Sequence, residues 1–359
     1  MLTTFSRSTS RLSLGAVISF LTTIIGLAPL THADTLSQTE TPQVQISNID
    51  HPSPPDVALD RTGVSGGISG NALIQLGGID ARHQPVTEAL VLPLTKDSRW
   101  ISVPFAEGRA WASASQHGDE LILAGGLIRG DATTKVTRIQ WKDGKLVSSE
   151  LPTLPNPLLG AGSAIIGDTL YVVGGISSPD SHEALRNVHT LNLMTPDAGW
   201  KSIDPLPGSG KILPMVTGHY ELLEVIGGRT PDGHGKFMSS KDVLLYRRKA
   251  AEGMTFTGWS RAADLPLPLA AGRAIPSGQA HTIILGADTT PLVSDPLSLN
   301  LTGDSPTLLF HAVTDAWVKA TSGEQFLNPA FAKDQNGSFL IFGGKGMHHP
   351  LQLTTPRTS

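Results

Sequence analysis

Three cations in this chain occupy the same place relative to doubled glycines. Arg61, Arg109 and Lys211 each lie 16 residues before the first glycine of a Gly-Gly pair, and Arg273 lies close to the corresponding position of a further copy. Equivalent positions of a closed repeat fold face one axis, so these side chains are expected to converge, and converging positive charges favour an anionic ligand. A guanidinium suits a carboxylate because its planar fork donates to both oxygens. The spacing therefore predicts a substrate-binding funnel made by Arg61, Arg109, Lys211 and Arg273.

The same cations have a structural alternative. Each can donate hydrogen bonds to nearby backbone carbonyls or pair with an acid such as Asp60 or Glu107. Glu107, two residues before Arg109, is either an axial acid or base or the ion-pair partner of that arginine, and the ion pair is favoured. His348 and His349 are adjacent, and adjacent residues on a strand point to opposite faces. No metal site and no cofactor are therefore expected.

A short apolar run that ends in small residues repeats six times. The copies follow one another at intervals of 48 to 59 residues, and they occupy residues 72–78, 121–126, 170–175, 223–228, 282–287 and 339–344. Each is preceded by a strand rich in small residues and a turn, of which Gly118-Asp119 and Asn336-Gly337 are typical hairpin signals. A Trp and a Pro-containing segment follow most copies. This pattern predicts an all-β protein, a six-bladed kelch-type β-propeller.

Both ends of the chain bear on how such a ring closes. The last copy is too short for a full four-stranded blade, while residues 41–60 resemble a strand followed by a Pro-rich crossing segment. We therefore expect residues 43–50 to pair with the C-terminal blade and close the ring, which also protects its edge strand. The predicted propeller spans residues 43–359.

The first 33 residues have the layout of a secretory signal peptide. Arg7 and Arg11 precede an apolar run, and small residues end at Ala33, which predicts cleavage after Ala33. Residues 34–42 are then a flexible N-terminal segment. An uncleaved anchor is the alternative, because the apolar run approaches membrane-spanning length. After cleavage no contact with a membrane is expected.

The composition narrows the classes of function. The chain has no cysteine, a net charge of -4 and a pI near 6.3. A disulfide framework and a thiolate nucleophile are excluded, and no basic surface for nucleic acid is indicated. Export without cysteines fits a bacterial periplasm. The expected partner is a small acidic sugar, and a homodimer is left open.

Two stretches resemble successive kelch blades of the bacterial N-acetylneuraminate epimerases, or sialic acid mutarotases: "GVSGGISGNALIQLGGID" at 63–80 and "EGRAWASASQHGDELILAGGLIRGDATTKV" at 107–136. The stretch "LPNPLLGAGSAIIGDTLYVVGG" at 154–175 is similar to the segment with which those proteins begin. The blade order is thus rotated, as in the cyclically permuted mutarotase family. The resemblance implies a periplasmic propeller that interconverts the anomers of a sialic acid. One group protonates the ring oxygen while another removes the anomeric hydroxyl proton.

The chain departs from this family at the reacting groups. The family carries a Glu directly after the strand-ending Gly of one blade and an Arg six residues later, whereas Gly344 and Pro350 stand at the aligned positions here. Lys345, His348 and His349 are nearby. The candidates for proton transfer are Glu107, Arg109 and His349.

Two functions stay open. The first is a carbohydrate isomerase that acts on N-acetylneuraminate or a related acidic sugar, and it predicts a polar, cation-lined axial pocket. The second is a non-catalytic kelch propeller that binds a glycan or protein partner in the periplasm, and it predicts a plugged channel with an exposed apolar loop patch.

Overall fold

The computed structural model describes residues 45–48, 61–248, 257–278, 280–300, 305–320, 325–334, 337–347 and 349–354. The chain divides into two units, Met1–Thr39 and Glu40–Ser359. The predicted signal peptide and residues 34–42 lie outside the described residues. Within the described part, no helix is long and apolar enough to cross a membrane.

Six four-stranded antiparallel sheets, formed by hairpin-linked strands of four to seven residues for the most part, make up the described fold. Sheet 1 holds β2 (Ser65–Ser69), β3 (Ala72–Leu76), β4 (Glu88–Pro93) and β5 (Ile101–Pro104); sheet 2 holds β6 (Ser113–His117), β7 (Glu120–Ala124), β10 (Val136–Lys142) and β11 (Lys145–Leu151); sheet 3 holds β12 (Gly162–Ile166), β13 (Thr169–Val173), β14 (Val188–Asn192) and β15 (Lys201–Ser202). Sheet 4 holds β16 (Met215–His219), β17 (Leu222–Ile226), β20 (Val243–Arg247) and β21 (Gly258–Arg261); sheet 5 holds β22 (Arg273–Ser277), β23 (His281–Leu285), β25 (Thr307–His311) and β26 (Ala316–Ala320); sheet 6 holds β27 (Ala330–Lys333), β28 (Phe339–Phe342), β29 (Leu351–Thr354) and β1 (Gln45–Asn48).

Two smaller sheets lie in the connections. One pairs β8 (Leu127–Ile128) with β9 (Asp131–Ala132), and the other joins β18 (Arg229–Pro231), β19 (Phe237–Ser239) and β24 (Leu292–Val293). A single 3-10 turn, Pro196–Ala198, interrupts the otherwise all-β described chain.

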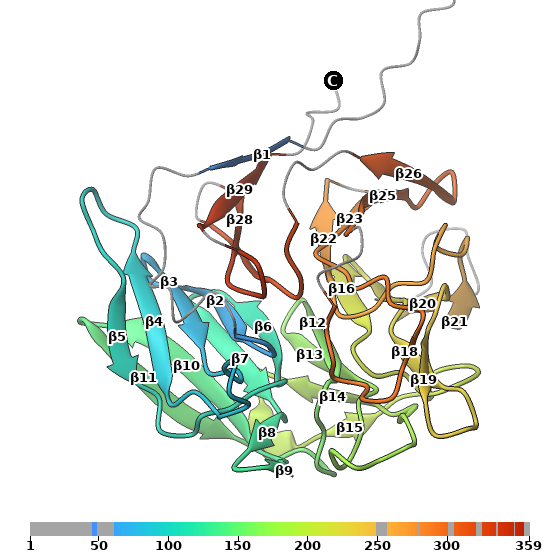
Figure 1. Cartoon of the computed structure of the whole chain (residues 1–359), viewed down its shortest axis with the longest axis horizontal. Helices are drawn as coiled ribbons and strands as arrows, with labels where there is room; N and C mark the ends of the chain where they lie inside the picture. Colours follow the sequence, from blue (N-terminus) through green and yellow to red (C-terminus); the bar gives the residue numbers. More distant parts are fainter. Residues whose placement is uncertain are drawn as a thin grey trace, which may run out of the picture. The chain divides into compact units, whose positions relative to one another are not determined.

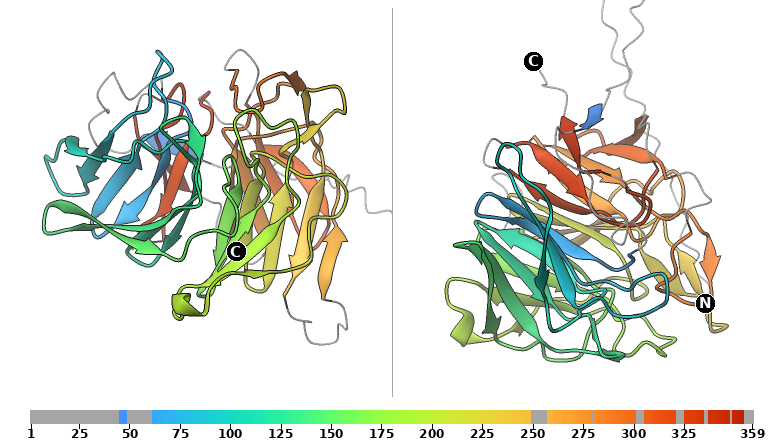
Figure 2. Two further views of the ribbon diagram at one scale, coloured as in Figure 1. Left: turned by 90° about the horizontal axis from the view of Figure 1, so that it is seen from below. Right: turned by 60° about the vertical axis from the view of Figure 1, so that its left-hand side comes forward.

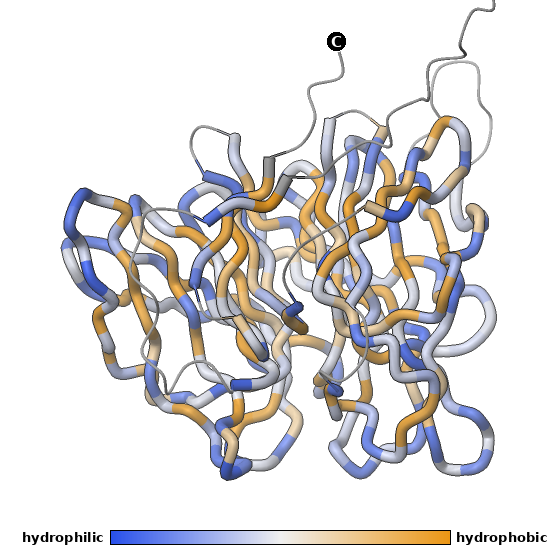
Figure 3. Tube along the Cα trace, turned by 45° about the horizontal axis from the view of Figure 1, so that its top comes forward, coloured by the Kyte–Doolittle hydropathy of each residue, from blue (hydrophilic) through white to orange (hydrophobic). Residues whose placement is uncertain are grey.

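Apolar clusters join each sheet to the next around a ring. Ile74 of sheet 1 clusters with Leu121 of sheet 2, and comparable clusters follow between each later pair of sheets. Ile68 and Phe342 belong to the cluster that joins sheet 6 back to sheet 1. Figure 1 shows the sheets arranged around a common centre, and Figure 3 shows the apolar residues concentrated along the strands. This closed succession is a β-propeller, which confirms the expected all-β propeller fold.

The strand nearest the N-terminus completes sheet 6. β1 pairs antiparallel with β29, with Ile46 opposite Leu353, and Ile46 packs against the cluster between sheets 5 and 6. The right-hand view of Figure 2 shows the short blue strand beside the red one. The pairing agrees with the expectation that residues 43–50 close the ring, because it covers an edge that would otherwise be open.

In sheets 1 to 4 the second glycine of the doublet ties the sheet to the segment that enters the next one. The amide of Gly78 donates to the carbonyl oxygen of Arg109 at 3.0 Å, and that of Gly175 donates to Lys211 at 2.7 Å. Gly77 has a φ of +55°, and a Cβ added to it would lie 1.9 Å from the Arg109 oxygen. Only glycine fits there, because the neighbouring backbone occupies the space of a side chain.

Candidate functional site

The residue two positions before the start of each innermost strand has a left-handed backbone conformation, and together these six residues encircle the axis. The φ angles lie between 49° and 65° at Gly63, Trp111, Gly160, Leu213, Ala271 and Asn328. A chain of backbone hydrogen bonds links them: Trp111 donates to Gly63, Gly160 to Trp111, Leu213 to Gly160, and Ala271 to Leu213. At Asn328 the side chain takes over, and Nδ2 donates to the Ala271 oxygen at 2.8 Å. These bonds fix the rim of an axial cavity.

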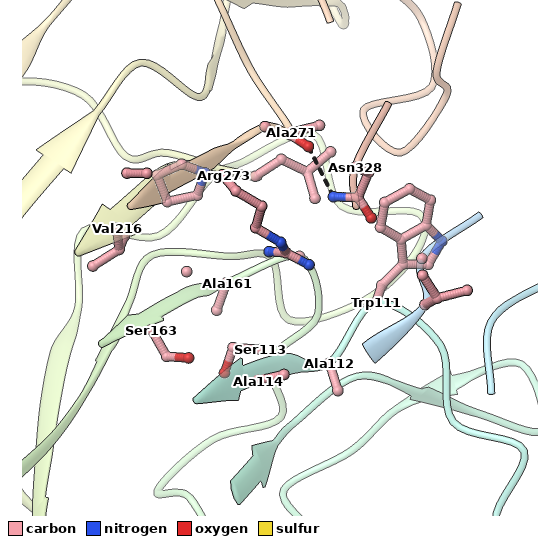
Figure 4. A pocket seen from close by; sticks show the side chains of 18 of the residues that line it. Trp111, Ala112, Ser113, Ala114, Ala161, Ser163, Val216, Ala271, Arg273 and Asn328 are labelled. Carbon is pink, nitrogen blue, oxygen red and sulfur yellow. Dashed lines mark hydrogen bonds between the residues drawn. The ribbon is translucent and has the colours of Figure 1, made fainter. Parts of the chain in front are cut away.

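Arg273 points into this cavity. It is the first residue of β22, and Figure 4 shows its guanidinium directed into the space between Trp111, Asn328 and Ala161. Nε donates to the carbonyl oxygen of Pro329, which directly precedes β27 of the neighbouring sheet. The cavity has a volume of about 40 Å³, and none of its described lining residues is an acid. Burial lowers the pKa of Arg273 to about 10.

A larger cavity adjoins the first one. Its volume is about 370 Å³, and the two share Ala114, Ser163, Val216 and Phe331 in their linings. It lies at the end of the axis where the turns between the first and second strands of the sheets are found. We call this end of the axis the turn end. Two aromatic residues, Phe331 and Phe339, line this cavity. The polar residues of its lining are Ser115, Gln116, Thr217, Lys333 and Asp334. Its volume is in the range of small-molecule sites, whereas the cavity at Arg273 has room for only part of a ligand.

The opposite end of the axis, where the glycine doublets lie, is covered by apolar side chains. We call this group the apolar end cluster; it includes Trp111, Leu159, Ile212, Leu213, Phe237 and Ala271. β18, β19 and β24 lie next to it, and Arg229 fastens them: it donates to the Pro296 and Ser298 oxygens at 2.6 and 2.8 Å and pairs with Asp288 at 3.2 Å. The axial cavities are therefore most open toward the turn end.

The structure does not bring the four predicted cations together. Arg273 is the only one of them among the residues that line the two cavities. Arg109 donates to Thr137 at 2.8 Å and pairs with Glu107, and Lys211 lies 3.0 Å from Asp242. Arg61 is buried, and this burial lowers its pKa. The negative charges of Glu88 and Asp80 act in the opposite direction and raise that pKa.

Arg61, Arg109 and Lys211 do not line either axial cavity, and their part in substrate binding stays a prediction. Arg109 and Lys211 each present their backbone carbonyl to the preceding doublet. Their side chains bond Thr137 and Asp242, at the third strand of their own sheet. Burial lowers the pKa of both Arg109 and Lys211, and the charges of Glu107 and Asp242 respectively oppose the shift. Arg109 and Lys211 are thus paired with acids of their own sheets.

The predicted proton-transfer groups also lie away from the cavities. Glu107 pairs with Arg109 and, at 3.3 Å, with Lys135. These two ion pairs agree with the favoured expectation that Glu107 is an ion-pair partner. His349 is half-buried between β28 and β29, outside the linings of both cavities. Its part in proton transfer stays a prediction. His348 lies outside the described residues.

Sequence reasoning did not find Gln116, Asn328 or Lys333. The repeat shows which strands are innermost, but it does not show which end of those strands borders a cavity. These three residues can be selected only when that end is known. Among the described residues, no group of three or more His, Cys, Asp or Glu side chains is placed to hold a metal.

A buried carboxyl group lies between sheets 4 and 5. Glu224, on β17, accepts a hydrogen bond of 2.6 Å from Thr282 Oγ1, and His219 Nε2 is 3.3 Å from the same hydroxyl. Burial raises the pKa of Glu224 to about 7, although the hydrogen bond from Thr282 acts against that rise. The group is 1% exposed and does not line either cavity.

The chain is similar to known proteins in part of its sequence and in its fold. No protein-family model matches the chain. The N-acetylneuraminate epimerases of Haemophilus influenzae strains PittEE and 86-028NP are each 33% identical over 95 residues, which is 26% of this chain and 24% of the relative. The chain thus spans about a quarter of the length of the curated relatives it matches. A solved structure of YjhT superposes with a TM-score of 0.64 at 16% identity, covering 86% of this chain and 98% of that one. This likeness shows a shared fold.

Proposed function

We propose that this protein is a six-bladed kelch propeller with a rotated blade order that binds N-acetylneuraminate or a related acidic sugar on its axis and interconverts the sugar's anomers. The observation that carries the proposal is the guanidinium of Arg273, which faces the axial cavity without an acid among the described lining residues. The partial similarity to N-acetylneuraminate epimerases supports the choice of sugar.

Arg273 is a half-buried cation with no acid among the described residues that line its cavity, and such a site favours an anionic ligand. Burial disfavours the charged form of Arg273, and a bound carboxylate would restore the balance through two parallel hydrogen bonds. Nε is already held by Pro329, so the terminal amino groups are the donors that remain for the ligand. In a cavity screened from water these bonds are stronger than at a surface.

In a sialic acid the carboxylate is attached to the anomeric carbon, so a carboxylate on Arg273 holds the reacting centre beside it. The hydroxyls of Ser113 and Ser163 and the amide of Asn328 line the same cavity. Ring opening needs a proton at the ring oxygen and loss of the anomeric hydroxyl proton. These groups are candidates to position the sugar and the water molecules that transfer those protons.

A second candidate is binding of an acidic sugar without catalysis. It is favoured by the same cavity, because its described lining offers no carboxylate as a general base, and by Gly344 and Pro350 at the positions of the family's Glu and Arg. We further propose that either activity takes place in the periplasm, after cleavage behind Ala33.

The experiment follows the α-to-β conversion of N-acetylneuraminate by proton NMR with the chain from residue 34 onward. The wild type and Arg248→Gln, which breaks a half-exposed ion pair with Glu221, are expected to accelerate conversion over buffer, whereas Arg273→Met is not. Saturation transfer to the sugar without acceleration would select the binding function. Neither transfer nor acceleration with the wild type would reject both.

A further inference from the structure

Gln116 has a hydrogen-bond acceptor that the described protein leaves unused. Its side chain lines the larger cavity at the end of β6, and its Nε2 donates to the carbonyl oxygen of Gly118 at 3.2 Å. Its Oε1 is buried and accepts no hydrogen bond from any described residue. Buried polar atoms are nearly always paired, so this oxygen is suited to a donor that a ligand brings.

The rest of this wall combines polar groups with aromatic rings. The hydroxyls of Ser115 and Ser163 are 2.8 Å apart, and Lys333 lies over the ring of Phe339 at 5.6 Å from its centre. Phe331 contributes a further ring. The serine hydroxyls can donate to and accept from a sugar and the lysine ammonium can donate to it, while the rings pack against its C–H faces.

The two cavities have a fixed order along the axis. Arg273 is held at the level of Pro329, which directly precedes β27. Lys333, the last residue of β27, comes four residues later, a separation of about 13 Å at the usual rise of a strand. The apolar end cluster covers the side of Arg273 that faces the glycine doublets. A ligand whose carboxylate contacts Arg273 therefore extends toward Gln116 and Lys333.

We propose that the larger cavity is a subsite for the hydroxyl-bearing end of the acidic sugar, that Gln116 Oε1 accepts a hydrogen bond from a hydroxyl or amide N–H of that end, and that the ligand arrives through the turn end with its carboxylate leading. This inference rests on the proposed function. It assigns the direction of access and a specificity-determining residue.

The first test measures binding by calorimetry with two probes, N-acetylneuraminate and tetrahydropyran-2-carboxylate, which keeps the ring and carboxylate but has no polyhydroxyl end. Gln116→Met is expected to weaken the first about tenfold, as loss of one hydrogen bond does, and to leave the second unchanged. Arg273→Met is expected to weaken both. Gln140→Met, the same substitution on β10, is the matched control.

Equal affinity of the wild type and Gln116→Met for N-acetylneuraminate would overturn this inference and leave the proposed function standing. Binding of neither probe by the wild type would overturn both. An equal loss for both probes in Gln116→Met would also contradict the subsite, because the small probe does not reach it.

The second test uses the absence of cysteine from the chain. Lys333→Cys, at the turn end, and Met238→Cys, on the exposed part of β19 at the other end, each provide one thiol for a bulky maleimide. Labelling of Lys333→Cys is expected to reduce N-acetylneuraminate affinity at least tenfold relative to the same unlabelled variant. Labelling of Met238→Cys is expected to have no effect, and the reverse pattern would overturn the direction of access.

Discussion

The Nε atom of Arg273 donates a hydrogen bond to the carbonyl oxygen of Pro329 across the boundary between sheets 5 and 6. This bond orients the guanidinium so that its two terminal amino groups face the axial cavity (Figure 4). Since a lysine has no donor at the Nε position of arginine and no planar fork, charge alone is not equivalent to this arrangement.

Arg273→Lys is therefore expected to bind N-acetylneuraminate at least tenfold more weakly than the wild type, even though the positive charge is kept. Arg273→Met is expected to lose binding and to unfold at an equal or higher urea concentration, because it removes a half-buried cation whose cavity has no acid among its described lining residues. Calorimetry and urea unfolding measure the two effects. Full affinity of Arg273→Lys would show that the fork is not used.

Arg229→Met is expected to destabilise the protein by about 3–5 kcal/mol, because it leaves the Asp288 carboxylate buried without its partner. Both side chains of this ion pair are fully buried. Arg248→Met breaks the half-exposed pair with Glu221 and is expected to cost at most about 1 kcal/mol. Chemical unfolding of the two variants gives the comparison, and similar losses would contradict the assigned importance of burial.

Glu224→Gln is expected to change the pH dependence of stability. The pKa of Glu224 rises from 4.5 to about 7 on folding, so the folded state favours the protonated form. The stability that this form contributes is fully present below pH 4.5 and is lost as the pH rises through 7, with a slope of at most about 1.4 kcal/mol per pH unit.

The variant has no such titration, so its stability relative to the wild type is expected to increase from pH 5 to pH 8. Burial lowers the pKa of His219 and of His281, which gives the opposite trend, but both histidines are present in the wild type and the variant. Glu150→Gln, an exposed substitution, serves as the control. A difference between Glu224→Gln and the wild type that does not vary with pH would contradict the raised pKa.

Gly77→Ala and Gly118→Ala separate backbone strain from a steric clash. Both glycines have positive φ angles, +55° and +56°, but a Cβ meets the Arg109 oxygen at position 77 and nothing within 4 Å at position 118. Gly118→Ala is expected to cost about 1–2 kcal/mol, and Gly77→Ala substantially more. Thermal unfolding measures both, and equal shifts would mean that the doublet is not closely packed against the next sheet.

Removal of residues 34–48 is expected to lower the unfolding midpoint, because β29 loses its partner strand and Ile46 leaves the cluster between sheets 5 and 6. Removal of residues 34–42 alone keeps β1 and is expected to have no effect. The two truncations are compared by thermal unfolding, and equal midpoints would show that β1 does not stabilise the ring.

The repeated apolar runs were sufficient to predict the two innermost strands of each sheet, the four-stranded repeat and the pairing of β1 with β29, but not the two smaller sheets in the connections. Strand formation depends on the local alternation of residues and on turn residues such as Gly118, which are visible in the sequence. The glycine doublets were likewise informative, because a close backbone approach excludes every other residue type.

The sequence by itself determined the propeller and its repeat, but only the tertiary structure decided which cation faces the axis. Arg109 and Arg273 differ by three residues in their offset from the doublet. That difference moves the side chain from a crossing segment, where Arg109 is enclosed with Glu107 and Thr137, to the first position of an innermost strand. An offset in sequence does not specify side-chain direction, which depends on the backbone geometry at the strand's start and on the acids that packing brings within reach.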